Sequence, residues 1–173
     1  MGKILAAFII VTALVAGVSM YYLQVYAFYD DVSTQQADIR VTPLGGGAPT
    51  PIGATDIWAI DADSSPIRFR ACFQSTLALD DLDAAFERYA SAEPLTAPRW
   101  FDCFDAEEIG EALERGDAAA FLGTENISYG IDRIVAILPD GRGFVWHQIN
   151  SCGEVVFDGQ PTPDGCPTPP ESD

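Results

Sequence analysis

The sequence predicts an α+β protein in which an N-terminal transmembrane helix precedes a small antiparallel-sheet domain with two covering helices. Three observations predict this class: an uncharged apolar run near the N-terminus, two pairs of strand-like segments joined by turn residues, and two amphipathic helical segments between those pairs. Two hairpins separated by helices are typical of an α+β domain whose helices cover one face of the sheet.

The N-terminal apolar run covers residues 4–29 and contains no charged residue. It is longer than the ~20 residues that a helix needs to cross the hydrocarbon core of a bilayer. Lys3 precedes the run, and Asp30 and Asp31 follow it. The positive-inside rule therefore places residues 1–3 in the cytoplasm and the C-terminal part outside. We expect the lipid bilayer to be the partner of residues 4–29.

A cleaved signal peptide is the alternative interpretation of this run. Gly17 and Ser19 could be the small residues of a cleavage site. The run exceeds the about 7–15 apolar residues of a signal peptide, and cleavage would leave an aromatic stretch at the new N-terminus. We therefore favour an uncleaved anchor.

Residues 30–55 contain the sequence VTPLGGGAPTPIGAT, whose glycines and prolines predict a spacer. A folded domain is expected over residues 56–166. Its first two strands are predicted at residues 57–62 and 67–73, joined by a polar turn that ends in proline at residues 63–66. The second of these strands alternates apolar with other residues, as a half-buried strand does.

Two helices are expected next. The first begins at Asp80 and places Leu82, Ala85, Phe86 and Tyr89 on one face, with Asp80 or Asp81 as the N-cap. The second covers residues 106–115, with Asp105 as its N-cap and Gly116 following its last residue. Residues 118–122 could be either a strand or a continuation of this helix.

A second hairpin is predicted from residues 130–138 and 144–150, because Asp140-Gly141 between them is a strong turn signal. Five prolines fall within residues 161–170. We expect residues 167–173 to form a disordered tail.

The four cysteines all lie on the predicted outer side of the membrane, which is where disulfides persist. They are Cys72, Cys103, Cys152 and Cys166. No Cys-x-x-Cys spacing occurs, so a thioredoxin-type site and a zinc ribbon both lack their pattern. Four cysteines allow three pairings. We prefer Cys72–Cys103 and Cys152–Cys166, because these pairs close the shorter loops.

The charge of the outer part excludes one class of partner. Residues 30–173 contain all 26 acidic residues, 8 arginines and no lysine, for a net charge of −18. Such a surface repels phosphate backbones, so a nucleic-acid partner is not expected. A cationic partner would instead be attracted to it.

The sequence assembles no catalytic, metal-binding or cofactor-binding motif. His147 is the only histidine, so one chain cannot form a multi-histidine metal site. An extracytoplasmic enzyme that uses His147 with a nearby acid such as Asp132 is the alternative function. Trp146, His147 and Gln148 form a candidate recognition surface beside Cys152, because tryptophan often anchors interfaces. The competing interpretation is that Trp146 packs in the core.

Four segments carry a resemblance to a known family: the first thirty residues, WFDCFD, YGIDRI and WHQINSCGE. Together they resemble a small alphaproteobacterial family of membrane-anchored proteins whose domain has no assigned function. The resemblance covers nearly the whole chain and implies an inner-membrane protein that faces the periplasm. Because that family has no assigned activity, it implies no functional residue. We therefore expect a single-pass, non-catalytic accessory or binding protein that acts beside a membrane protein partner.

Overall fold

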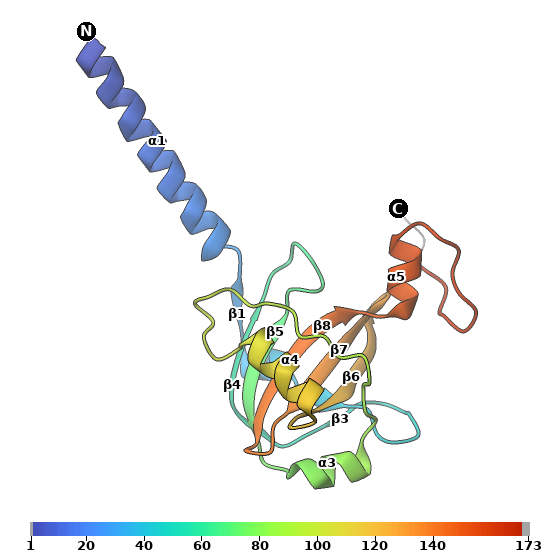
Figure 1. Ribbon diagram of the computed structural model, residues 1–173. Coiled ribbons are helices and arrows are strands. Elements are labelled where there is room, and N and C mark those ends of the chain that lie inside the picture. The colour runs from blue at the N-terminus through green and yellow to red at the C-terminus, as the bar shows by residue number, and fades with distance from the viewer. Residues whose placement is uncertain (1, 171–173) are drawn as a thin grey trace. The chain divides into compact units, whose positions relative to one another are not determined.

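The computed structural model describes residues 2–170 and divides into two compact units, one ending at Asp30 and one beginning at Asp31 (Figure 1). The first unit contains the helix α1, Gly2–Val25. Its 24 residues span about 36 Å at the α-helical rise. None of its described side chains is buried, and its composition and length make it a candidate membrane span or signal sequence. The helix ends at Val25, short of the predicted residue 29, because residues 26–28 form a turn.

The second unit is built on a six-stranded sheet with the order β1-β4-β5-β8-β7-β6. The pairs β4–β5, β5–β8, β8–β7 and β7–β6 are all antiparallel. The strands are β1 Asp30–Val32, β4 Ala54–Asp61, β5 Arg70–Ser75, β6 Ala119–Ser128, β7 Ile131–Ile137 and β8 Arg142–Ile149. Both predicted hairpins are therefore confirmed, and the α+β class is correct.

Both faces of the sheet are covered, whereas the sequence predicted cover on one face. Helix α4, Ala106–Arg115, covers the face that carries Phe144 and Trp146, and Phe104 just before the helix packs edge-on against both rings. Figure 1 shows α4 lying across the strands. The opposite face carries Val145 and belongs to a buried cluster formed with the segment between β1 and β4.

That segment corrects the predicted spacer at residues 30–55. It contains the short helix α2, Thr34–Ala37, and a two-stranded sheet of β2, Arg40–Val41, and β3, Thr50–Pro51. Ile39, Val41 and Ile52 are at most 6% exposed and pack in the core. These apolar residues are isolated among glycine and proline, so their pattern resembles a linker. Their burial makes the segment one of the two layers that cover the sheet.

The first predicted helix is also shorter than expected. Helix α3 is Leu79–Ala85, and Ala78 at its N-cap makes no side-chain bond. The chain then becomes extended: Glu87 N–H donates to Thr42 O, and Tyr89 N–H donates to Ala120 O. Phe86 and Tyr89 follow a helical spacing in the sequence, but α3 ends at Ala85, and the backbone of residues 87–89 instead supplies partners for the edge strand β6.

The remaining elements agree with local signals. Asp105 Oδ1 accepts bonds from the first turn of α4, and Gly116 ends the helix in the left-handed conformation, as predicted. Residues 118–122 belong mainly to β6. Helix α5, Ser151–Phe157, was not predicted; the Asn150 side chain caps it by accepting from the N–H groups of Cys152 and Gly153.

The disulfides join Cys72 to Cys103 and Cys152 to Cys166, which confirms the predicted pairing. The first bridge joins β5 to the segment before α4, and the second joins α5 to the chain that follows it. Residues 167–170 have no regular secondary structure. The prediction for residues 171–173 lies outside the described residues.

Two glycines allow α5 to approach the β6–β7 turn. A Cβ atom added to Gly153 would lie 2.2 Å from Gly130 O, and one added to Gly130 would lie 2.5 Å from Gly153 Cα. Gly130 also has a φ of +72°, which favours glycine. The contact between this turn and α5 is therefore a contact between two backbones.

We predict that Gly153→Ala lowers the free energy of unfolding by about 1–3 kcal/mol, because the added methyl group overpacks this contact. Gly110→Ala in α4 is the matched control: its Cβ would meet nothing nearer than Pro94 Cδ at 4.0 Å. The control should be neutral or more stable by about 0.5–1 kcal/mol. Urea unfolding of the full-length protein measures both values, and equal effects would contradict the close approach.

Candidate functional site

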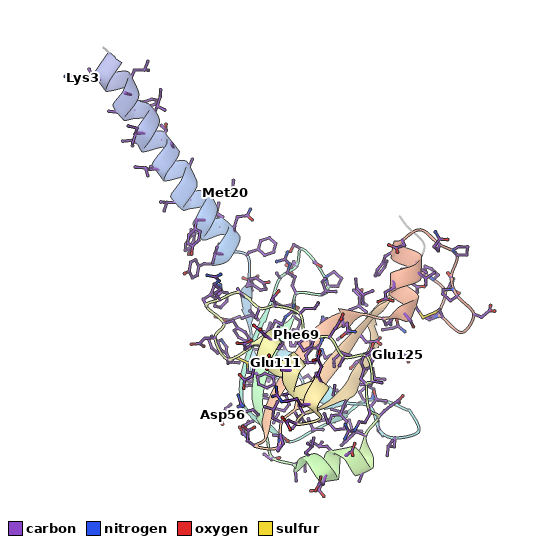
Figure 2. All side chains as sticks on the ribbon, viewed as in Figure 1. Lys3, Met20, Asp56, Phe69, Glu111 and Glu125 are labelled. Carbon is purple, nitrogen blue, oxygen red and sulfur yellow. A yellow bond between two sulfur atoms is a disulfide. The ribbon has the colours of Figure 1, made fainter. Side chains whose placement is uncertain are left out.

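Four side chains form a row across the face of the sheet opposite α4. His147 on β8 lies opposite Arg133 on β7. Phe69 immediately precedes β5 and stacks on the His147 ring, with the ring centroids 4.9 Å apart. Asp61 at the end of β4 completes the row. Figure 2 labels Phe69 within the domain. This row contains the only histidine of the sequence, and histidine is the most frequent acid–base group in enzymes.

Both ring nitrogens of His147 are engaged. Nδ1 lies 2.6 Å from Pro66 O, and Nε2 lies 3.0 Å from Arg133 Nε. The guanidinium can only donate, so Nε2 must accept and Nδ1 must carry the proton that is donated to Pro66. The residue is 6% exposed. His147 is thus a neutral imidazole with a fixed tautomer.

Burial, followed by the charge of Arg133, lowers the pKa of His147 to about 4. Burial also lowers the pKa of Arg133, whose guanidinium lies 4.3 Å from the centre of the Phe69 ring and donates to Ala37 O at 3.3 Å. Burial raises the pKa of Asp61. The row therefore combines a neutral histidine with an arginine that is stacked on an aromatic ring.

A cavity of about 410 Å³ opens beside His147 and is also lined by Asp61, Asp63, Ser65 and Ser128. A general base needs an available nitrogen within reach of a substrate. His147 offers none in this arrangement, since both nitrogens are bonded within the protein. The described residues contain no group of three or more metal-ligating side chains.

The structure separates His147 from Asp132, the acid suggested as its catalytic partner. Asp132 lies opposite Gln148, so its side chain is on the other face of the sheet. There Asp132 Oδ1 accepts from Asn126 N–H at 2.9 Å and from Asn150 Nδ2 at 2.7 Å, and Oδ2 accepts from Tyr89 Oη at 3.2 Å. The pairing of His147 with Asp132 is therefore wrong.

This buried network joins three separate segments. Asn126 is in β6, Asn150 caps α5, and Tyr89 belongs to the extended segment beside β6. Burial, followed by the charge of Asp132, raises the pKa of Tyr89 to about 12. The phenol therefore remains a donor at neutral pH. Asp132 is 5% exposed and uses its bonds to hold these segments together.

The candidate recognition surface at Trp146, His147 and Gln148 is also wrong, because these residues are not presented to solvent together. Trp146 is 0% exposed and packs beneath α4, as the competing interpretation predicted. Gln148 donates to Ser91 O at 2.8 Å and accepts from Glu93 N–H at 2.7 Å. Gln148 therefore fastens the segment that crosses the sheet before α4.

Sequence reasoning missed the polar residues that hold the loops. Asn150 had a usable signal, since asparagine directly before Ser151 is a good N-cap. Asn126 and Tyr89 had no comparable signal, because their partner Asp132 comes from another strand. The opposite faces of His147 and Asp132 follow from strand alternation once the register of β7 and β8 is known.

These observations define a class of protein: an α+β domain with two disulfides and a sheet covered on both faces, preceded by a candidate membrane helix. A family model described as a family of unknown function (DUF6446) matches residues 39–167. The chain belongs to this family. Comparisons with curated proteins and with solved structures found no match.

We predict that His147 makes the fold sensitive to acid. The unfolded chain binds the proton near the ordinary pKa of 6.5, whereas the folded chain binds it only near pKa 4. Stability is therefore full above pH 6.5 and falls as the pH drops from 6.5 towards 4. Between pH 7 and 5 the wild-type protein should lose about 2 kcal/mol more than His147→Gln. Urea unfolding at both pH values measures this difference, and parallel losses would refute the assignment.

Asp132→Ala should destabilise the full-length protein by about 2–4 kcal/mol, because it removes the acceptor of three hydrogen bonds, from Asn126 N–H, Asn150 Nδ2 and Tyr89 Oη. Asp164→Ala, at an exposed position, is the control and should change stability by less than about 0.5 kcal/mol. Thermal and urea unfolding provide the comparison. A small loss at Asp132 would mean that the network does not hold these segments together.

Proposed function

We propose that this protein is a single-pass membrane protein whose disulfide-linked domain lies in the periplasm and acts as a non-catalytic accessory or binding subunit beside a membrane protein partner. The proposal combines a location, which the anchor and the disulfides support, with a mode of action, which the use of the buried polar side chains supports.

The location is supported by three features. Helix α1 is long and apolar enough to cross a bilayer, and Lys3 lies at its N-terminal end. All four cysteines are paired in disulfides, which persist in oxidising compartments. Only residues 26–29 lie between the end of α1 and the start of β1. A connection of that length spans at most about 14 Å, so an uncleaved anchor would tether the domain to the membrane by a short link.

The mode of action rests on one observation: the histidine that the enzymatic alternative requires is used to hold the fold. His147 binds a loop through Pro66 O and binds Arg133 on the neighbouring strand. Asp132 serves a different network on the opposite face. A domain that uses its buried polar groups in this way offers its surface, and not a reaction centre, for function.

Location and partner are tested separately. We expect a reporter that is active only in the periplasm to work when fused after Asp173, and one that is active only in the cytoplasm to fail there. We also expect the mature protein to retain residues 4–29. Activity of the cytoplasmic reporter alone would contradict the orientation, and a mature N-terminus near Met20 would contradict the anchor.

For the partner, we expect the full-length protein to copurify with one membrane protein in fixed stoichiometry from membranes in mild detergent. His147→Gln should retain that partner at neutral pH. In the control, both disulfides are reduced before extraction. If the folded domain makes the contact, the reduced protein should no longer copurify with the partner. Absence of any stoichiometric partner would contradict the accessory role.

A further inference from the structure

The domain has a second hollow, on the α4 side of the sheet. An apolar groove of about 360 Å³ lies between the second half of α4 and residues 88–94, the segment that Gln148 fastens to the sheet. Its apolar lining consists of Ala90, Ala92, Pro94, Leu113, Ala118 and Ala120. Gly110 of α4 also lines it. The walls are mostly small side chains, so the space is large enough for one or two aliphatic side chains of another molecule.

The packing of the fold does not explain why residue 110, which lines this groove, is a glycine. Glycine in the interior of a helix is less favourable than alanine, and close packing is the usual reason for its presence. Here a Cβ atom would meet only Pro94 Cδ, at 4.0 Å, and the residue has no left-handed conformation. A side chain at this position would fit the fold but would project into the groove. The glycine therefore keeps the groove open.

The charge at the rim indicates what can enter. Glu93 and Glu114 line the groove, and neither carboxylate has an ion-pair partner among the described residues. Arg88, the cation of the lining, is bonded to Asp83 and lies over the Phe121 ring. An occupant that carries a positive charge next to its apolar side chain would pair with these carboxylates.

We infer that the groove between α4 and residues 88–94 binds a segment of a membrane protein partner that carries an aliphatic side chain flanked by lysine or arginine. The inference rests on the proposed accessory function and names the surface that performs it. A second copy of this chain is a poor occupant. Residues 30–173 carry a net charge of −18, so two copies of the domain would repel each other. A basic segment is attracted by the same charge.

The test uses the full-length protein in its own membrane. A photoreactive p-benzoylphenylalanine is introduced in place of Ala90, which is exposed on the groove wall, and in place of Glu111 as a control on α4 (Figure 2). After irradiation, the cross-linked peptide is sequenced by mass spectrometry. We expect the Ala90 position, and not the Glu111 position, to capture one segment that has an aliphatic residue next to lysine or arginine.

Two pairs of variants link the cross-link to the groove. Gly110→Leu fills the groove, and its control Glu111→Leu adds the same side chain to α4 outside it. Glu93→Gln with Glu114→Gln removes the rim charges, and its control is Glu107→Gln with Glu111→Gln. Each test variant should lower the yield of the Ala90 cross-link at least about tenfold, whereas each control should leave it within about twofold. Unchanged melting temperatures and the absence of free thiols establish that the variants are folded.

The outcomes separate this inference from the function on which it rests. If a stoichiometric partner copurifies but Gly110→Leu retains both partner and cross-link, the groove is not the binding surface while the accessory role stands. A cross-link to lipid, to a second copy or to an acidic segment also overturns the inference. If no partner copurifies and no cross-link forms, the accessory function itself fails. If Gly110→Leu does not fold, the charge variants with their control decide the matter.

Discussion

Strand β8 lies between β5 and β7 and is buried on both faces, so its alternate side chains must fit two separate cores at once. Trp146 packs beneath α4, while Val145 belongs to the buried cluster that includes the segment from α2 to β3. A change of register by one residue would exchange these two sets. The covering layers therefore depend on the position of this one strand: α4 with its disulfide on one side, and the segment from α2 to β3 on the other.

The polar residues of the sheet have a common role, which is to hold irregular segments by their backbone. His147 bonds to Pro66 O, Gln148 bonds to the backbone of Ser91 and Glu93, and Arg70 donates to Leu95 O and Thr96 O. Arg70 is 4% exposed, and its guanidinium also donates to Ile67 O and Phe69 O. A small sheet with long connections needs such bonds, because an unpaired buried polar group costs more than a bond contributes. The same bonds leave His147 no free nitrogen.

The sequence was sufficient where the signals were local. Helix α4 could be predicted because Asp105, Gly116 and an apolar stripe all lie within or beside it, and the β7–β8 hairpin could be predicted from Asp140-Gly141. The prediction failed where distant partners decide the structure. Residues 87–89 were expected to continue a helix but pair with β6. The apolar residues between β1 and β4 are too scattered in the sequence to indicate a core layer.

In the candidate site, too, features set by local sequence could be predicted and features set by distant partners could not. The cysteine pairing was predictable from loop length, whereas the engagement of His147 depends on Pro66 and Arg133, which come from a loop and another strand. The groove beside Gly110 could not be predicted either, since residues 88–94 were expected to be partly helical. Its open space exists only because that segment is extended and fastened to Gln148.

The central claim is that His147 serves the fold as a buried neutral imidazole. The most direct measurement is ¹⁵N NMR of the imidazole ring in the full-length protein in nanodiscs, followed from pH 7 to pH 4. The account predicts the neutral tautomer protonated at Nδ1, with no titration until the pH approaches 4. Titration near pH 6.5, or a ring protonated at Nε2, would contradict it and would make His147 available for chemistry.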